Sequence, residues 1–572
     1  MRLAERRRLT AVARGAAPAD LYIRGGTLLN VYTGELYPAN VAVRGERIAY
    51  VGTRADMVDA NTTVLDAARR VLVPGYVDPH VHPAHVITPA ALARHVLALG
   101  TTALFADTLQ FWELGGVRAF IAVADALARS PVKFYWMIRP HAQSRTTDER
   151  RRFPIRDLVR ALAHPSAVAV GEVTRWPDVH AGDPHLLRRL DLALTRGQRV
   201  EGHTAGASAE KLPAIAAGGL SSDHEPITAR EVLERARQGI AVMLRESSLR
   251  PDLSDLLDAF KEAPGLAARA MLTADGSMPA FVLEHGFVDH LIRTAMQRGV
   301  SPADAYRMAT LNPATYFGKD ADLGGIAPGR YADICILRDL DEPRPQTVIA
   351  RGRVAARDGR ALLAIPQPPW RRVFATPAAR LRVSWRARPD DFRLPDRPTL
   401  PVLRLVSAVI TKVEERAPQS TDLHAALLDR RGRWVAPALV AGFAERVDGL
   451  ATTISTDFNI LALGRRRESI VRAVNRLLEV RGGVVLVDGD EVTWELPLPL
   501  GGIMTDAELP EAAARERELS RHLAERGYTF HEPLFTLFFL SADFLPAARL
   551  TPRGVWDVKA ARVLLPSRAR AS

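Results

Sequence analysis

The sequence predicts an α/β protein built on a closed (β/α)8 barrel, with a small flanking β-domain and a C-terminal α/β domain. Between residues 74 and 320, short apolar strands alternate with Ala-, Leu- and Arg-rich helical stretches, and eight such units fit one barrel. Short alternating strands precede and follow this region. A chain of 572 residues is also too long for one core and is expected to hold roughly two to four domains.

The composition is that of an ordinary globular protein, with 47% hydrophobic and 25% charged residues. One cysteine, Cys335, excludes a disulfide framework and a cysteine-rich metal site. No apolar run approaches the roughly 20 residues that a membrane helix needs, and the basic N-terminus lacks the apolar core of a signal peptide. We therefore expect a soluble, cytoplasmic protein without a membrane partner.

The net charge of +12 does not point to a nucleic-acid partner. Its basic residues are mostly arginines spread along the chain among 65 acidic residues. The short clusters at 6–8, 150–152 and 465–467 lie in different segments and lack interleaved aromatic residues. We expect no nucleic-acid binding.

The N-terminal region begins with a basic leader, residues 1–17, expected to be helical or disordered. Residues 20–31 and 40–52 then alternate and turn like antiparallel strands. Together with residues 321–362, which resume this pattern, residues 18–73 are predicted to form the flanking β-domain.

In the segment 71–83, Val-Leu-Val-Pro-Gly-Tyr-Val-Asp-Pro-His-Val-His-Pro, an apolar run of strand character ends in the turn pair Pro-Gly and resumes as a short strand, the first of the barrel. Residues i and i+2 of a strand share a face, so His80 and His82 point the same way and are able to bind one cation. Considered alone, the pair is equally well explained as two strand-end histidines without a ligand.

Seven further strands are predicted at 101–107, 132–138, 167–173, 198–203, 219–224, 240–244 and 270–275. Catalytic groups of this barrel lie at the carboxyl ends of its strands. The candidate ligands that fall at such ends are Glu172, His203, His224 and Asp275. Carboxylates and imidazoles in this order favour a divalent-metal site suited to Zn, Mn or Fe over unrelated strand-end residues.

Beyond the barrel, residues 363–401 are rich in Pro and Arg and are predicted to be a linker. Residues 402–566 are predicted to form the second α/β unit, with a helix from about 468 to 480. The strongly apolar segment 535–540 is interpreted as core or subunit interface.

Several motifs now identify a family. The His-x-His pair, the later His, His and Asp, and Gly-Gly-Ile-Ala-Pro-Gly-Arg-Tyr-Ala-Asp at 324–333 resemble the metal-dependent amidohydrolase superfamily. More narrowly, the chain from about 18 to 565 resembles bacterial adenine deaminases. The motifs that carry this resemblance are Gly-Glu-Val at 171–173, Ser-Asp-His-Glu at 222–225, Met-Leu-Arg-Glu at 243–246, Met-Ala-Thr-Leu-Asn-Pro-Ala at 308–314 and Glu-Leu-Pro-Leu-Pro-Leu-Gly-Gly-Ile-Met at 495–504.

The resemblance implies a metal-dependent hydrolase barrel, residues 74–320, with an adenine deaminase-like C-terminal domain. It implies hydrolytic deamination of adenine to hypoxanthine and ammonia in purine salvage, with a nucleobase or related heterocycle as the small-molecule partner. One or two divalent ions are expected, Mn²⁺ or Fe²⁺ with Zn²⁺ as a further candidate, in a homo-oligomer. The implied metal ligands are His80, His82, Glu172, His203, His224 and Asp275, with Glu172 where many superfamily members have a bridging carboxylated lysine.

The resemblance also suggests catalytic roles for three residues. Asp275 is expected to accept a proton from the attacking water and to pass it to the leaving ammonia. Glu225 is expected to protonate or hydrogen-bond a ring nitrogen, and Arg245 to hold that carboxylate or the substrate. For Glu225 and Arg245, a surface ion pair is an equally weighted alternative.

Five positions depart from the family pattern. Ala84, Leu109, Gln110, Ser455 and Phe458 stand where the better-known members carry Glu, a His-Glu pair and two histidines. Two alternatives therefore stay open: hydrolysis of another cyclic amidine or amide at the same metal site, and a catalytically silent binding relative. Candidate replacements for the lost polar groups are His85 and Trp176.

Overall fold

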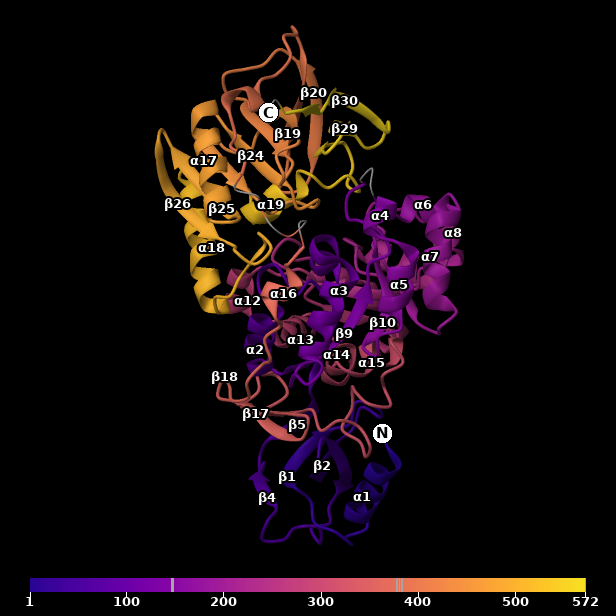
Figure 1. Cartoon of the computed structure of the whole chain (residues 1–572). Coiled ribbons are helices and arrows are strands. Elements are labelled where there is room, and N and C mark those ends of the chain that lie inside the picture. The colour runs from indigo at the N-terminus through magenta and orange to yellow at the C-terminus, as the bar shows by residue number, and fades with distance from the viewer. Residues whose placement is uncertain (146–148, 377–378, 380, 382–383, 571–572) are drawn as a thin grey trace.

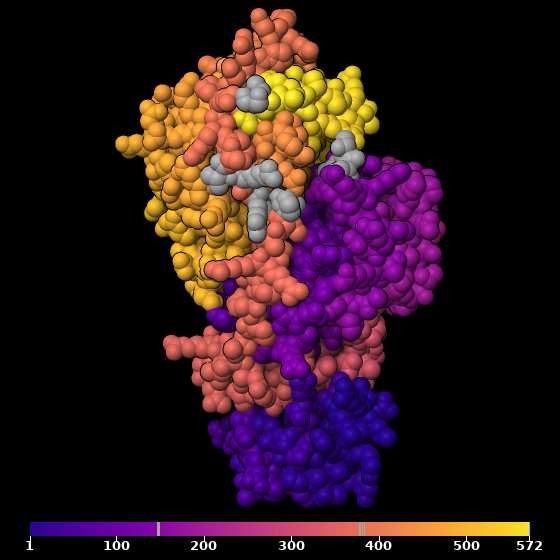
Figure 2. Space-filling view, viewed as in Figure 1, coloured from indigo at the N-terminus to yellow at the C-terminus, as the bar shows by residue number. Residues whose placement is uncertain are grey.

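The computed structural model describes residues 1–145, 149–376, 379, 381 and 384–570. Figure 1 shows three parts stacked along one axis, with the N-terminal strands at one end, the barrel in the middle and the C-terminal sheet at the other end. In the space-filling view, the segment that follows the barrel runs along its side and joins the outer parts (Figure 2).

The N-terminal strands and the strands that follow the barrel form one nine-stranded sheet. Its order is β18-β17-β16-β15-β5-β1-β2-β3, and β4 pairs with β1. Residues 1–17 contribute a helix, α1 (Leu3–Ala13), because Leu9 and Val12 bury one of its faces against this sheet. The strands are β1 (Leu21–Leu29), β2 (Leu36–Arg44), β3 (Arg47–Gly52), β4 (Thr63–Asp66), β5 (Val71–Pro74), β15 (Ile334–Leu337), β16 (Thr347–Ala350), β17 (Arg353–Arg357) and β18 (Arg360–Ala361).

The barrel strands lie in chain order, β14-β13-β12-β11-β10-β9-β8-β6, and each neighbouring pair is parallel. A parallel bridge between Val81 and Asp275 brings the first and last strands together, so the predicted barrel fold is confirmed. The strands are β6 (Tyr76–Val81), β8 (Thr101–Asp107), β9 (Lys133–Ile138), β10 (Ala167–Val173), β11 (Arg199–Gly202), β12 (Ser222–Asp223), β13 (Ala241–Arg245) and β14 (Met271–Thr273).

Helices cover the outside of the barrel, and its interior is packed. Inward-facing Val77, Phe105, Met137 and Met243 form a cluster that Phe317 contacts, and this cluster leaves the opposite end for polar groups. The principal helices are α2 (Pro89–Ala98), α3 (Leu109–Leu127), α5 (Ile155–Leu162), α7 (Pro184–Leu194), α8 (Leu212–Ala217), α9 (Ala229–Arg237), α13 (Val288–Gln297) and α14 (Pro302–Met308).

Shorter helices complete the barrel region. They are α4 (Glu149–Arg152), α6 (Trp176–His180), α10 (Leu253–Leu256), α11 (Ala259–Glu262), α12 (Pro279–His285) and α15 (Leu311–Tyr316).

Two predicted strands, 219–224 and 270–275, are shorter in the structure. Strand β12 ends before His224, and β14 ends at Thr273, so that Asp275 makes only the isolated bridge with Val81; its φ of 48° is incompatible with a continuing strand. The candidate ligands His224 and Asp275 therefore lie just past the strand ends, in the loops that form the barrel mouth.

The C-terminal part contains a second nine-stranded sheet, ordered β20-β19-β22-β21-β24-β23-β25-β26, with β31 on β22. Helix α17 (Arg467–Glu479) buries Ile470, Val474 and Leu477 against it. The strands are β19 (Leu400–Leu405), β20 (Thr411–Arg416), β21 (Leu423–Leu428), β22 (Trp434–Ala441), β23 (Gly449–Thr452), β24 (Ile460–Gly464), β25 (Gly483–Asp488), β26 (Glu491–Pro497) and β31 (Arg568–Ala569).

Two further elements attach this part to the barrel. Helix α18 (Leu509–Ala524) packs on α12, and β27 (Met504–Thr505) pairs with β7 (Val86–Ile87) just after the His-x-His pair. Helix α19 (Pro533–Phe539) lies between the C-terminal sheet and the barrel (Figure 1). A small sheet of β28 (Ala548–Thr551), β29 (Gly554–Asp557) and β30 (Arg562–Pro566) follows.

The predicted linker, 363–401, contains helix α16 (Trp370–Val373), which contacts α3, and the 3₁₀ turn η2 (Pro389–Phe392). Its residues 377, 378, 380, 382 and 383 lie outside the described residues. Among the described helices, none combines the length and apolar character needed to cross a bilayer.

Candidate metal centre

The six predicted metal ligands converge at the carboxyl end of the barrel. His80 lies on β6 and Glu172 on β10. His82, His203 and His224 directly follow the ends of β6, β11 and β12, and Asp275 lies two residues after the end of β14. They form two groups of three, and within each group the ligand atoms lie within 4.8 Å of one another. We call His80, His82 and Asp275 the first triad, and Glu172, His203 and His224 the second triad.

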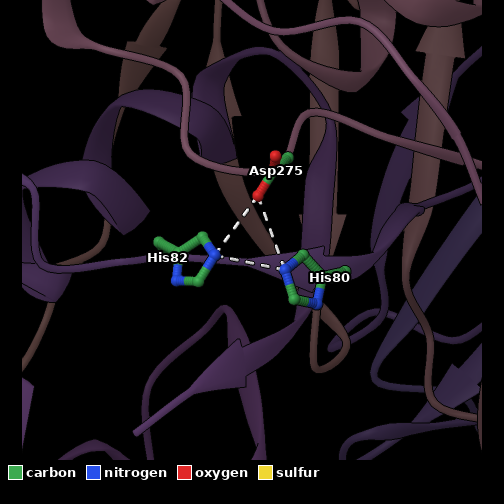
Figure 3. A group of neighbouring side chains, drawn as sticks. All are labelled: His80, His82 and Asp275. Carbon is green, nitrogen blue, oxygen red and sulfur yellow. Dashed lines mark hydrogen bonds and ion pairs between the residues drawn. The ribbon is translucent and has the colours of Figure 1, made fainter. Parts of the chain in front are cut away.

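The first triad presents two ring nitrogens and one carboxylate oxygen to a common point (Figure 3). The Nε2 atoms of His80 and His82 are 3.2 Å apart, and they lie 3.4 and 3.3 Å from Asp275 Oδ1. Asp275 reaches this point from a left-handed backbone conformation that non-glycine residues rarely adopt. Such local strain is typical of functional positions.

The second triad has the same composition. His224 Nε2 is 3.4 Å from both Glu172 Oε1 and His203 Nδ1, and His203 Nδ1 also contacts Glu172 Oε1. The other carboxylate oxygen, Glu172 Oε2, lies 3.8 Å from His82 Nε2. Glu172 therefore lies between the two triads, with one oxygen directed to each.

Buried carboxylates hold the opposite ring nitrogens. His224 Nδ1 donates a hydrogen bond of 2.9 Å to Glu201 Oε1, and the same oxygen is 3.5 Å from His80 Nδ1. Asp107 Oδ2 lies 3.1 Å from His82 Nδ1. An imidazole whose Nδ1–H faces a carboxylate presents its Nε2 lone pair to the other side, which is the form that binds a metal.

The sequence analysis missed Glu201 and Asp107, although a signal existed for both. Glu201 precedes His203 by two residues on a strand, so the two share a face, and Asp107 ends its strand as the predicted ligands do.

Two guanidinium groups complete the centre. Arg139, fully buried, contacts Asp107 and Glu172 Oε2. Arg245 Nη1 contacts Glu225 Oε1 and lies 3.4 Å from Asp275 Oδ2. Glu225 and Arg245 are 8% and 2% exposed, so the alternative of a surface ion pair is wrong. They pair inside the barrel mouth, where Glu225 Oε1 is also 3.4 Å from His203 Nδ1.

Negative charge dominates around the four imidazoles. Burial alone would lower the pKa of His82, but hydrogen bonding with Asp107 and Asp275 and their charges raises it to about 10. Burial alone would raise the pKa of Glu225, but the charges of Arg245 and of the His203 and His224 rings lower it to about 2. Buried anions in such excess require cations.

This donor set fits one or two divalent ions. Neutral imidazoles and carboxylates are ligands that Zn²⁺, Mn²⁺ and Fe²⁺ accept. His80 and His82 direct their Nε2 atoms at each other and at a carboxylate, an arrangement that a shared cation explains better than hydrogen bonding. The positions of the charged groups thus suit a metal centre.

A pocket of about 700 Å³ opens above the second triad and Asp275. Phe535 and Phe538 of α19 line it, which corrects the interpretation of 535–540 as core or interface alone. The apolar pattern could not reveal this because it does not say which face of a helix meets a cavity. Further lining residues are His82, His85, Leu109, Gln143, Glu172, His203, His224, Glu225, Arg245, Ser247, Leu249, Arg250, Asp275, Gly276, Val409, Phe539, Phe544 and Leu545.

The structure separates the two candidate replacements for missing polar groups. His85 stacks on His82, with ring centroids 5.3 Å apart and an interplanar angle of 14°. Trp176 instead donates its Nε1–H to Ala205 O at 3.0 Å and is absent from the described lining of the pocket. Of the five departing positions, Leu109 lines this pocket, and Ala84, Gln110, Ser455 and Phe458 line an adjoining one.

Two family models match the chain. The amidohydrolase family model matches residues 71–355, and the adenine deaminase C-terminal domain model matches residues 406–562. A putative adenine deaminase of Halalkalibacterium halodurans is 35% identical over 98% of this chain and 97% of that protein. Adenine deaminases of Rubrobacter xylanophilus and Moorella thermoacetica are 34% and 33% identical, each over 96% of this chain and 95% and 96% of their own length.

Proposed function

The chain belongs to the adenine deaminase family of amidohydrolases, and we propose that it hydrolyses adenine to hypoxanthine and ammonia at a divalent-metal centre. The observation that carries this proposal is the pair of buried triads at the barrel mouth, each with imidazole nitrogens and a carboxylate oxygen directed at one point. We assign His80, His82 and Asp275 to one ion, and Glu172, His203 and His224 to a second.

A divalent ion bound by these residues supplies activation of water at neutral pH and stabilisation of negative charge. Glu172 holds the two halves of the centre together, because its oxygens face different triads. Arg139 fixes the Glu172 carboxylate from behind and opposes the charge of Asp107. The catalytically silent alternative is disfavoured because all six ligands are present and oriented.

Asp275 is the proposed proton carrier. Burial alone would raise its pKa, but hydrogen bonding with His80 and His82 and the charge of His224 hold it well below its usual range. An ionised Asp275 accepts the proton of the attacking water. It returns that proton to the exocyclic nitrogen, so the C6–N bond breaks with ammonia as the leaving group.

Glu225 is proposed to recognise the ring. With a pKa of about 2 it is ionised at neutral pH, so it accepts a hydrogen bond from a ring N–H and does not act as an acid. Arg245 keeps this carboxylate charged and in place. The flat, apolar walls contributed by Phe535 and Phe538 suit an aromatic heterocycle.

We extend the proposal to the cellular setting implied by the family. The ion is Mn²⁺ or Fe²⁺, the enzyme is a cytoplasmic homo-oligomer, and the reaction serves purine salvage. Support for the ion comes from the imidazole and carboxylate ligands, which Mn²⁺ and Fe²⁺ share with Zn²⁺.

The test is ammonia release by metal-loaded protein from adenine, other aminopurines, pterins and cyclic ureas. We expect adenine or a close aminopurine to be deaminated, with activity lost on removal of the metal. Release from cyclic ureas but from no aminopurine would favour the other cyclic amidine or amide hydrolases. Purified protein that retains no stoichiometric metal would contradict the proposal.

A further inference from the structure

Two ligands of the second triad lie where the backbone pairing of their strands has ended. The register of β11 with β12 stops at Gly202 and Asp223, one residue before His203 and His224. Hydrogen bonds between these two strands therefore do not set the distance between the two rings. A metal site needs its ligand atoms within about 0.2 Å of their ideal distances, so other contacts must fix this spacing.

The side chain of Asp223 joins the two loops beyond the strand ends. Its Oδ1 accepts a hydrogen bond of 2.9 Å from Thr204 N, and its Oδ2 accepts one of 2.5 Å from Thr204 Oγ1. Thr204 directly follows His203 in the chain, and Asp223 directly precedes His224. One carboxylate thus connects the neighbours of two ligands of the second triad.

Arg235 of α9 completes this contact. It is 1% exposed, and its Nε donates a hydrogen bond to Asp223 Oδ2. Its Nη2 lies 3.1 Å from Thr204 O and 3.0 Å from Thr204 Oγ1. Arg235 therefore neutralises the buried charge of Asp223 and holds both oxygens of Thr204. We call Thr204, Asp223 and Arg235 the second clamp.

A different carboxylate joins the ligands of the first triad across the seam between β14 and β6. Asp78 Oδ2 accepts a hydrogen bond of 3.0 Å from Ala274 N. Asp78 Oδ1 lies 2.8 Å from Thr273 Oγ1 and 3.0 Å from His80 N. Thr273 Oγ1 also accepts a hydrogen bond of 3.2 Å from Asp275 N. We call Asp78 and Thr273 the first clamp.

The two clamps are separate. Among the residues that the structure describes, no hydrogen bond joins one clamp to the other. The first connects β6 with the end of β14, and the second connects the loop after β11 with β12 and α9. Every member of both clamps is at most 1% exposed, so bulk water does not compete for these hydrogen bonds. The carboxylate of Glu201, in contrast, contacts rings of both triads.

We propose that the two clamps position the two ions independently, so that breaking one clamp weakens one ion and spares the other. Thr204 is the positioning residue for the ion of the second triad, and Thr273 is the positioning residue for the ion of the first. This inference rests on the proposed function, because it requires divalent ions at both triads. Each hydroxyl acts by fixing the spacing of two ligands.

The test replaces each threonine by valine, which keeps the shape of the side chain and removes the hydroxyl. Crystals of each variant are equilibrated with a series of free Mn²⁺ concentrations, and anomalous diffraction gives the occupancy of each triad. Thr204→Val is expected to need at least about tenfold more Mn²⁺ to half-fill the second triad, with the first triad changed by less than about twofold. Thr273→Val is expected to show the reverse.

A solution measurement accompanies the crystals. The electron paramagnetic resonance spectrum of Mn²⁺ distinguishes a coupled pair of ions from a single ion. At a concentration that fills both triads of the unmodified protein, each valine variant is expected to give the spectrum of a single ion and about half the bound Mn²⁺.

Serine is the matched control, because it restores the hydroxyl. Thr204→Ser and Thr273→Ser are expected to bind both ions within about threefold of the unmodified affinity. Equal weakening of both ions in a valine variant, occupancies equal to those of the unmodified protein, or a single ion in the unmodified protein would overturn the inference. If a valine variant does not fold, alanine at the same position is tested with the same criteria, and the other threonine gives an independent test.

The same measurements separate this inference from the proposed function. Unmodified protein that binds Mn²⁺ at neither triad would overturn both. Two bound ions with clamp-specific losses, but no ammonia release from adenine, would overturn the proposed function and leave the inference standing. Ammonia release by a protein whose valine variants lose both ions together would do the opposite.

Discussion

Glu201→Gln tests whether one carboxylate orients both halves of the metal centre. Glu201 is fully buried, and its Oε1 lies 2.9 Å from His224 Nδ1 and 3.5 Å from His80 Nδ1. A glutamine keeps the volume, and its amide oxygen is able to replace Oε1 as an acceptor, but it removes the negative charge that holds both rings. One ring in each triad therefore loses its orientation.

Removing such a partner typically weakens metal binding by 10- to 100-fold. Because Glu201 contacts both triads, we expect the upper part of this range, about 2 to 3 kcal/mol of metal-binding free energy. The assay is competition with a chelator of known affinity at fixed pH, followed by kcat measured at saturating metal.

The matched control is Glu414→Gln on β20, which loses ion pairs with Arg404 and Arg416 far from the barrel mouth. Its metal Kd is expected to stay within twofold of that of the unmodified protein. A Glu201→Gln protein with unchanged metal Kd and unchanged Tm would refute the reasoning, because the carboxylate would then have no orienting role.

Three further predictions concern the proton carrier, the ion and the C-terminal contact. Asp275→Asn is expected to lower kcat at least 100-fold in an ammonia-release assay, with an unchanged circular-dichroism spectrum, because the amide cannot carry the proton. The pKa of His82 is about 10 without an ion, so Mn²⁺ binding at pH 8 is expected to release at least one proton in an indicator assay. Below that pKa, the affinity of the protein for Mn²⁺ is expected to rise about tenfold for each unit by which the pH increases. Burial and, to a smaller extent, the charge of Glu532 raise the pKa of Glu516 to about 8. The folded state therefore binds the proton of the Glu516 carboxyl more tightly than the unfolded state does, and the free energy of unfolding falls as the pH rises from about 4.5 to about 8. Glu516→Gln is therefore expected to reduce this fall in the free energy of unfolding by a few kcal/mol. The measurement is the Tm of the variant minus the Tm of the unmodified protein, which is expected to be larger at pH 8 than at pH 5.

Each of these expectations has a contradicting result. Turnover by Asp275→Asn within tenfold of the unmodified protein would remove Asp275 from its role. Mn²⁺ binding without proton release would mean that His82 is already neutral. Parallel Tm profiles for Glu516→Gln and the unmodified protein would mean that Glu516 is ionised throughout this pH range.

The barrel and its ligands were predictable because one rule governs both. Parallel strands place their carboxyl ends at one mouth, so Glu172, His203 and Asp275, spread along the sequence, were expected to meet. The strand at 101–107 agrees with β8 in full, because every one of its residues is buried and its β-character is continuous.

What the sequence could not supply depends on side-chain direction and long-range packing. The position of Glu201 two residues before His203 indicates a shared strand face, but it does not show that Glu201 contacts His80 and His224, because those rings come from other strands. The pocket that adjoins the main one, lined by Ala84, Gln110, Ser455 and Phe458, likewise requires contacts between segments hundreds of residues apart. Gln110 from α3 and Phe458 from the C-terminal part meet there only once the two parts have packed.

The most direct test of the central claim is anomalous X-ray diffraction from crystals of the Mn²⁺-loaded protein. The account predicts one anomalous peak among His80 Nε2, His82 Nε2 and Asp275 Oδ1, and at full loading a second peak among Glu172 Oε1, His203 Nδ1 and His224 Nε2. A well-ordered barrel with no peak at either position, or with the ion bound elsewhere, would contradict it.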